Sequence, residues 1–184
     1  MNKCLTAILL ALSATASAQR LQPAPRLVVN ITIDQLRTDY IQAFAPLYGP
    51  DGFKKLLSEG CVYEAASYDF LPIDRASAVA SISSGTTPYY NNIVSSQWLD
   101  RATLRPVYCV ADSKVGTSPR LLSTSTIGDE LKVATGGSAL VYALAFSRDA
   151  AVLSAGHAAD GAVWVDDNRG VLATSAYYPQ KTHK

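Results

Sequence analysis

The apolar pattern of the chain begins with an almost unbroken run at residues 27–33. Its residue types favour β structure and do not alternate with polar ones, which is typical of a strand covered on both faces in a parallel sheet. The run stops at Asp34, and helix-compatible residues follow. Ligands of open α/β sheets bind beyond the carboxyl ends of strands, so the Asp34 carboxylate suits a metal ligand. Capping of the following helix is the alternative interpretation, and the pattern leaves both open.

Helix-like and strand-like segments alternate over the remaining chain. The spacing predicts helices near 40–45, over 52–60 with Gly60 as the stop, over 76–84 ending at Gly85, and over 125–134. It predicts strands over 61–68 and 139–146, a hairpin of 162–165 with 171–174, and a strand-like 175–178; residues 86–92 read as a turn, and an irregular region begins at Trp98. The alternation indicates an α/β fold with a mostly parallel sheet flanked by helices. Because nothing follows to cover residues 175–178, we expect an incomplete amino-terminal portion of a longer protein.

The first 18 residues have the pattern of a secretory signal peptide. A charged start is followed by a short apolar run and a small-residue cleavage site at residues 16–18. That run is too short to span a bilayer, and no later segment is long enough. We therefore expect residues 19–184 to form one exported domain, periplasmic or secreted. In that compartment Cys61 and Cys109 could form a disulfide, although two buried free thiols fit equally well.

The net charge of the chain bears on which partners it could bind. The net charge is +1 and no basic stretch stands out, which argues against a nucleic-acid polymer or an anionic membrane surface. No Gly-rich phosphate-binding loop follows the first apolar run, so a flavodoxin-like or P-loop domain is not expected.

Several short motifs occur in an order that resembles the amino-terminal part of the alkaline phosphatase superfamily. The similarity is strongest to the exported phosphate-irrepressible phosphatases of Bacteroidetes, relatives of the type I phosphodiesterases and nucleotide pyrophosphatases. The motifs are the run ending at Asp34, residues 52–60, Pro72 with the helix to Gly85, Trp98 with Asp100, residues 107–109, residues 129–132, and residues 155–157.

The resemblance implies a two-zinc phosphate-ester hydrolase with a threonine or serine nucleophile at a helix start. By resemblance, Asp34 matches the first zinc ligand. Arg75 occupies the nucleophile position, and Ser96 replaces an asparagine that contacts phosphate. The family's Lys-x-Arg pair falls on residues 147–149, where a shift of one or two residues would leave Arg148 in a cationic role.

These departures favour a catalytically inactive relative, because arginine cannot attack phosphorus and its fixed charge would repel a nearby metal. We expect zinc in the family but no tight zinc site in this chain alone, since the later ligands are absent and His157 is best interpreted as structural. Asp74 and Ser77 lie near the nucleophile position, but Ser77 is best interpreted as a small residue of a packed helix.

The alternatives are an active alkaline phosphatase or phosphodiesterase within a longer chain, or a non-catalytic module that binds an anion or a partner. A phosphate ester or free anion could bind at Arg75 or Arg148. An ion pair of Arg75 with Asp34 or Asp74 is at least as plausible. A partner chain or a missing carboxy-terminal part could complete the fold, and we expect the isolated chain to be marginally stable.

Overall fold

The structure is a computed structural model that describes residues 24–179. The predictions of a signal peptide at residues 1–18 and of a polar tail that includes His183 lie outside the described residues. Within residues 24–179, no helix combines the length and the apolar character needed to cross a bilayer.

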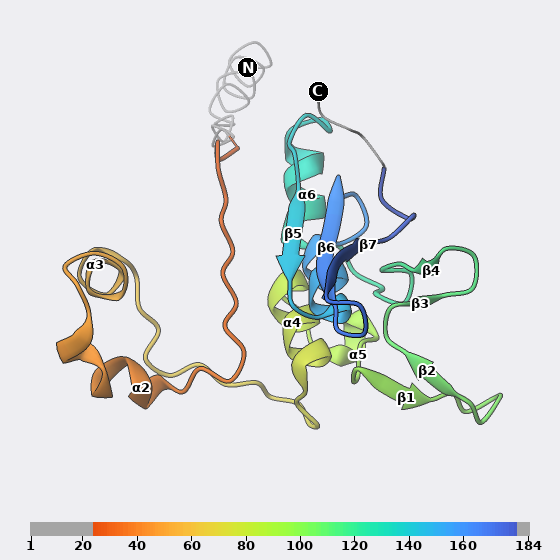
Figure 1. The fold of residues 1–184 in the computed structure, drawn as a ribbon, viewed down its shortest axis with the longest axis horizontal. Helices are drawn as coiled ribbons and strands as arrows, with labels where there is room; N and C mark the ends of the chain where they lie inside the picture. Colours follow the sequence, from red (N-terminus) through yellow and green to blue (C-terminus); the bar gives the residue numbers. More distant parts are fainter. Residues whose placement is uncertain (1–23, 180–184) are drawn as a thin grey trace, which may run out of the picture.

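The core forms between two helices and a three-stranded sheet (Figure 1). Helix α7 (Arg148–Ala155) packs against both helix α4 (Arg75–Ser84) and the strands β5 (Tyr142–Ala145) and β6 (Gly161–Asp166). Strand β7 (Val171–Thr174) completes the sheet. The inner helix α7 is therefore enclosed, and most of its side chains are buried.

Helix α4 begins and ends as its sequence predicts. The Asp74 carboxylate accepts a hydrogen bond from the Ser77 backbone N–H, and the Ser77 hydroxyl accepts one from the Asp74 N–H, so the pair forms a capping box. Gly85 ends the helix in the left-handed conformation, at φ +68°. Ala76 and Ala80 are fully buried, and such small side chains allow α7 to approach closely.

The sheet has the order β5–β6–β7. Strands β5 and β6 are parallel, with Tyr142 opposite Gly161, whereas β6 and β7 form the expected antiparallel hairpin, with Val165 opposite Leu172. Among the described residues, the outer edge of β5 pairs with no strand. Strand β5 also differs from the expected buried strand over 139–146, because it is shorter and half of its side chains are exposed.

The remaining elements form a loop-rich region beside the core. They are helix α5 (Pro88–Asn91), the antiparallel hairpin of β1 (Gln97–Leu99) and β2 (Pro106–Tyr108), the hairpin of β3 (Ala111–Asp112) and β4 (Gly116–Thr117), and helix α6 (Ile127–Ala134). Helix α5 replaces the turn expected at residues 86–92, and the β1–β2 hairpin lies where an irregular chain was expected from Trp98.

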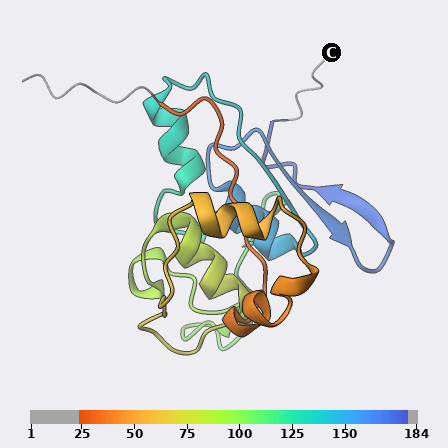
Figure 2. The same cartoon turned by 90° about the vertical axis from the view of Figure 1, so that its left-hand side faces the viewer.

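The amino-terminal part of the described chain lies to one side of this core (Figure 1), and Figure 2 views the molecule from that side, with the amino-terminal helices in front. It contains helix α2 (Thr38–Ala43), the 3-10 turn η1 (Ala45–Leu47) and helix α3 (Phe53–Glu59), and none of the three has a buried residue. The predictions of helices near 40–45 and over 52–60 are confirmed, including the stop at Gly60.

The prediction of a buried strand at residues 27–33 is wrong for this chain. The segment runs extended but pairs with no strand in residues 24–179, and Leu27 and Ile31 are 79% and 76% exposed. A strand needs hydrogen-bonding neighbours, and no strand within residues 24–179 lies alongside this segment. The strands expected at residues 61–68 and 175–178 are also absent from the described structure.

The two cysteines of the described region are free. Cys61 is exposed and Cys109 is buried, so no disulfide joins them in this structure, and only one thiol matches the expectation of buried free cysteines. Burial, with smaller effects from the charges of Asp149 and Asp74, raises the pKa of the Cys109 thiol to about 12. Cys109 therefore stays a neutral core residue.

Candidate functional site

An ion pair joins the first turns of the two core helices. The Arg75 guanidinium at the start of α4 donates from Nε and Nη2 to the two carboxylate oxygens of Asp149 on α7, at 3.3 and 3.2 Å. The Asp149 side chain is fully buried, whereas that of Arg75 is 44% exposed. A buried carboxylate needs such a partner, because an isolated charge is costly in a low-dielectric interior.

Two serines extend this cluster. The Ser96 hydroxyl donates to the Asp149 carboxylate at 3.3 Å, while the Ser96 backbone N–H donates to Asp74 at 2.6 Å. The Ser95 hydroxyl also donates to Asp74, at 2.9 Å. Arg75, Ser96 and Asp149 thus meet in space, although they are far apart in sequence. These are the positions, with residue 147, to which the resemblance assigns the nucleophile, the phosphate-contacting asparagine and the Lys-x-Arg pair.

The carboxylates of this cluster stay ionised. Burial would raise the pKa of Asp74, but backbone hydrogen bonds from Ser77 and Ser96, with contributions from the side chains of Ser95 and Ser96, lower it to about 2. Burial likewise opposes ionisation of Asp149, yet contacts with the side chains of Ser147 and Arg75 hold its pKa below the ordinary value. The hydrogen bond to Asp149 in turn raises the pKa of Arg75.

Asp34 lies at the end of the extended amino-terminal segment, as its sequence position suggested, but it does not cap the next helix. Helix α2 begins at Thr38 with Arg37 at its N-cap, and Asp34 is in the turn before it. Asp34 and Arg75 line the same groove, and the negative charge of Asp34 contributes to the raised pKa of Arg75. The expected ion pair of Arg75 with Asp34 or Asp74 is therefore wrong: the partner is Asp149.

The donor set in the described residues does not fit a zinc ion. Structural and catalytic zinc sites use at least three protein ligands, and residues 24–179 contain no cluster of three or more histidine, cysteine or acidic side chains placed to hold a metal. Asp34 instead shares its groove with the cationic guanidinium of Arg75.

Arg148 takes a different position from Arg75. Its guanidinium lies over the ring of Tyr108, 4.5 Å from the ring centroid. Stacking on an aromatic face is a common use of arginine in proteins. The side chain therefore has a local partner from strand β2, and the anion-binding role remains a prediction.

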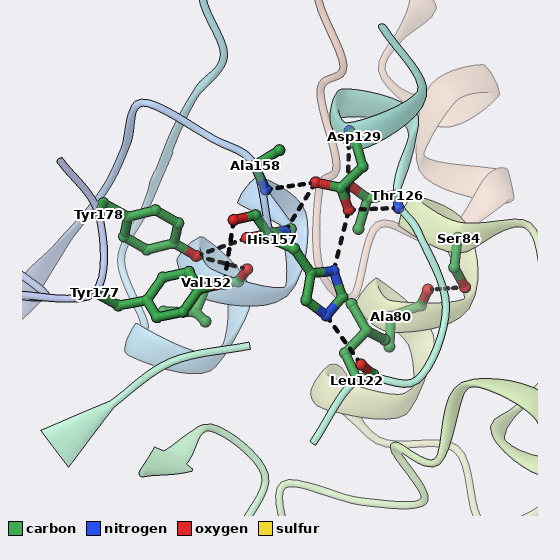
Figure 3. Close-up of polar contacts among 11 residues, drawn as sticks. Ala80, Ser84, Leu122, Thr126, Asp129, Val152, His157, Ala158, Tyr177 and Tyr178 are labelled. Atoms are coloured by element: carbon green, nitrogen blue, oxygen red, sulfur yellow. Dashed lines mark hydrogen bonds and ion pairs between the residues drawn. The ribbon is translucent and has the colours of Figure 1, made fainter. Parts of the chain in front are cut away.

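A second polar cluster surrounds His157, beyond the end of α7 (Figure 3). Its Nδ1 lies 3.2 Å from Asp129 Oδ2, and its Nε2 lies 3.0 Å from the Leu122 carbonyl oxygen. The Asp129 carboxylate also accepts the backbone N–H groups of Thr126, His157 and Ala158. Both ring nitrogens are thus occupied within the protein, which supports the interpretation of His157 as structural.

Charge reinforces this second cluster. Burial opposes ionisation of Asp129, but the hydrogen bond to the His157 side chain and those from the backbone of Ala158 and Thr126 lower its pKa to about 2. The same carboxylate raises the pKa of His157. Only the imidazolium can donate from both ring nitrogens, to Asp129 and to Leu122 at once.

Comparison with known protein families assigns the chain to a family. A sequence model described as type I phosphodiesterase / nucleotide pyrophosphatase matches residues 28–182. The chain belongs to the type I phosphodiesterase / nucleotide pyrophosphatase family.

Curated relatives of this phosphodiesterase family member include alkaline phosphatases. It is 37% identical to alkaline phosphatase PhoV of Synechococcus elongatus over 167 residues, which cover 85% of this chain and 30% of PhoV. It is 35% identical to alkaline phosphatase PafA of Elizabethkingia meningoseptica over 173 residues, which cover 88% of this chain and 32% of PafA. The chain thus spans about a third of the length of these relatives.

The crystal structure of wild-type PafA has the same fold over this part. The TM-score is 0.83 at 33% identity, with 89% of this chain and 34% of the PafA chain covered. The match confirms the resemblance to the amino-terminal part of the alkaline phosphatase superfamily and the α/β fold expected from the sequence. A related PafA structure carries changes at one threonine, one asparagine, one lysine and one arginine.

Sequence reasoning missed two residues that organise these clusters. Asp149 was noted only as a departure from the Lys-x-Arg pair, and no sequence signal showed that it would be buried against Arg75. Asp129 stands three residues after Thr126, the spacing of a capping box, and that signal would have identified it as an acceptor.

Proposed function

We propose that this chain is a non-catalytic relative of the zinc-dependent phosphate-ester hydrolases, in which an internal ion pair fills the reaction centre. The observation that carries the proposal is the contact of Arg75 with Asp149. By resemblance, these residues stand where the family has its nucleophile and a phosphate-binding arginine. The guanidinium has no nucleophilic atom, and the buried carboxylate would repel a phosphoryl group.

The charge balance of the cluster supports this proposal. Phosphoryl transfer depends on positive charge arranged around the transferred group. Here the positive charge of Arg75 is matched by Asp149, and Asp74 lies in the same network of hydrogen bonds. Ser96 donates hydrogen bonds to the same two carboxylates, from its backbone N–H to Asp74 and from its hydroxyl to Asp149. The charges and hydrogen-bonding groups of the cluster therefore have partners within the protein and need no substrate.

The same contacts disfavour a simple anion site as the function. Two of the donor atoms of Arg75 are used by Asp149, and Arg148 is stacked on Tyr108. A phosphate ester or free anion would have to displace one of these partners. We propose that the protein is exported, because its first 18 residues have the pattern of a secretory signal peptide.

The test is a chimera in which this chain replaces the matched third of PafA. We expect no zinc-dependent hydrolysis of p-nitrophenyl phosphate by this chimera. A second chimera carries Arg75→Thr, Ser96→Asn, Ser147→Lys and Asp149→Arg, which return the four positions to the family residues. We expect this version to hydrolyse the ester at least 100-fold faster than the first, because nucleophile and charge are restored together.

The matched control carries the last three changes but keeps Arg75. It should remain inactive, since it has the cationic groups but no nucleophile. The proposal would be wrong if the unmodified chimera hydrolyses the ester and Asp34→Ala abolishes that hydrolysis. Failure of the restored chimera, when PafA itself is active in the same assay, would count against the assignment of the four positions.

A further inference from the structure

The β1–β2 hairpin protrudes from the body of the molecule, on the side away from α2 and α3 (Figure 1). Its tip consists of residues 99–105, the last residue of β1 and the connection to β2. The Asp100 carboxylate accepts the backbone N–H groups of Ala102 and Thr103, at 2.9 and 2.7 Å, and the Thr103 hydroxyl, at 2.9 Å. The Asp100 N–H donates to the Arg105 carbonyl oxygen. The tip is therefore held in one conformation by its own hydrogen bonds.

Leu104 occupies a strained and exposed position in this tip. Its φ of +52° lies in the left-handed region, which is unfavourable for most residues with a Cβ and suits glycine or asparagine. Leu104 is nevertheless 71% exposed, and Leu99 at the end of β1 is 58% exposed. A strained backbone that exposes an apolar side chain gains little from packing within the described chain. Such an outlier is typical of a residue with a function.

The tip also carries two arginines without an ionic partner. Arg101 and Arg105 are exposed, and neither forms an ion pair within residues 24–179. The one carboxylate of the tip belongs to Asp100, and its Oδ1 atom is engaged in the turn. The tip therefore combines unpaired positive charge with exposed apolar side chains.

The size of the tip favours a lipid surface over a protein partner. A stable protein interface generally buries about 800 Å² on each side and involves about 20–30 residues there, whereas the tip has seven residues. A lipid surface needs no preformed pocket, because its headgroup region closes around an inserted side chain. Apolar side chains then lie at the acyl boundary, while guanidinium groups stay level with the phosphates.

We propose that the tip of the β1–β2 hairpin is a docking site for an anionic lipid surface. Leu99 and Leu104 enter the headgroup region, and Arg101 and Arg105 bind lipid phosphates. The rigid turn lowers the entropic cost of binding, because it presents the leucine without reordering the chain. The net charge of +1 argues against such a partner only as an average over the chain. The proposal does not depend on whether the reaction centre is catalytic.

Co-sedimentation of the expected mature chain, residues 19–184, with lipid vesicles tests this proposal. We expect about 10-fold stronger binding to vesicles of phosphatidylglycerol and phosphatidylcholine in equal parts than to phosphatidylcholine alone, and weaker binding at high salt. Leu104→Asn should lower the partition coefficient about 10-fold, because it removes the apolar group. Asparagine tolerates the left-handed region, so the turn stays intact. Arg101→Gln combined with Arg105→Gln should remove most of the preference for the anionic lipid.

Matched controls make the same kinds of change on other elements. Leu172→Asn alters a leucine that is 74% exposed on β7. Lys54→Gln combined with Lys55→Gln removes two exposed positive charges from α3. Both controls should bind the anionic vesicles as well as the unaltered chain does. Urea denaturation of each variant checks that a change in binding does not come from unfolding.

Several results would overturn the proposal. They are equal binding to the two kinds of vesicle, binding that Leu104→Asn and the paired arginine changes leave intact, and binding that the controls weaken as much as the tip variants do. Absence of binding to either vesicle would also overturn it and would leave the tip to a protein partner. The readout does not involve hydrolysis, so this proposal and that of a non-catalytic reaction centre can fail separately.

Discussion

At the scale of single residues, the buried charge of Asp149 sets the chemistry of the candidate site. Its carboxylate is fully buried, and Arg75 is its ionic partner. Removal of one member of a buried pair generally costs more than the pair contributes, because the other charge stays buried and unpaired. The partly exposed guanidinium of Arg75 can return to water, whereas Asp149 cannot. Asp149 therefore depends on Arg75 for its stability in the interior more than Arg75 depends on Asp149.

Gly156 is the position where a single added methyl group should do most damage. Its φ of +79° is unfavourable for other residues, and a Cβ there would collide with Thr126 Oγ1 and lie 2.6 Å from Asp129 Oδ2. We expect Gly156→Ala to lower the free energy of unfolding by about 3 kcal/mol, measured by urea denaturation.

Gly170→Ala is the control for that measurement. Gly170 has a similar φ of +65°, but no atom lies within 4 Å of the site of its added Cβ. The expected loss there is only about 1 kcal/mol. Equal losses for the two variants would mean that backbone strain alone, without the collision, explains the effect.

At the scale of elements, the cluster around His157 ties the carboxyl end of α7 to the start of α6. Asp129 of α6 accepts the backbone N–H groups of His157 and Ala158, and the His157 ring bridges it to the Leu122 carbonyl (Figure 3). The Tyr178 hydroxyl donates to the carbonyl oxygen of Gly156 at 3.0 Å. Helix ends leave such carbonyls without intrahelical partners, so this contact completes the end of α7.

The stability of this junction should depend on pH. The pKa of His157 is raised in the folded chain. Its contribution to stability is therefore fully present below its ordinary pKa of about 6.5 and is lost as the pH rises through the higher folded value. We expect the advantage of the native chain over His157→Gln to shrink by about 0.5 kcal/mol between pH 5.5 and 8.5, since the partly exposed ring is screened by solvent.

Urea denaturation at several pH values measures this difference. The comparison with His157→Gln cancels the titration of groups away from His157, and Asp129 is ionised throughout this pH range. A difference that stays constant over this range, or grows as the pH rises, would contradict the assignment of the imidazolium.

The correctly predicted elements are those that form because of residues close together in sequence, such as caps, helix stops and turns. Helix α4 follows from the Asp74 capping box and the Gly85 stop, and the β6–β7 hairpin from two apolar runs around a polar turn. Residues 27–33 form no strand because none of the described strands lies alongside them to pair with. Helix α7 was missed because its small side chains carry little periodicity, although they pack well.

The candidate site was only partly predictable. Resemblance singled out Arg75 and Ser96, and the structure brings both to one cluster. The partner of Arg75 was wrongly expected to be Asp34 or Asp74, because the contact with Asp149 depends on how α4 packs against α7. A tertiary contact across 74 positions in sequence leaves no local signal.

At the scale of the whole molecule, the described chain divides into a packed core and an exposed amino-terminal part. The buried apolar residues all lie between Ala76 and Tyr178, whereas α2, η1 and α3 bury none. Large apolar side chains such as Leu27, Leu47 and Leu71 are at least 79% exposed. Exposed apolar area on this scale is typical of a surface that another part of a protein covers.

This division predicts where a protease cuts the isolated chain. Residues 61–73 contain no helix or strand and join α3 to α4. We expect limited chymotrypsin digestion to cleave first within this connection, for example after Tyr63 or Tyr68, and to leave a resistant fragment that begins near Asp74. Mass spectrometry of the early products identifies the sites. First cleavage between α4 and α7 would show that the core opens as readily as the connection.

The salt bridge between α4 and α7 also has a historical consequence. Because the buried Asp149 carboxylate depends on the Arg75 cation, the two positions cannot be changed independently. A lone return to threonine at position 75 leaves a buried carboxylate without its cation. A lone arginine at position 149 would face another arginine. Either single substitution is therefore expected to destabilise the chain, so a return to the family residues at these two positions would require both changes together.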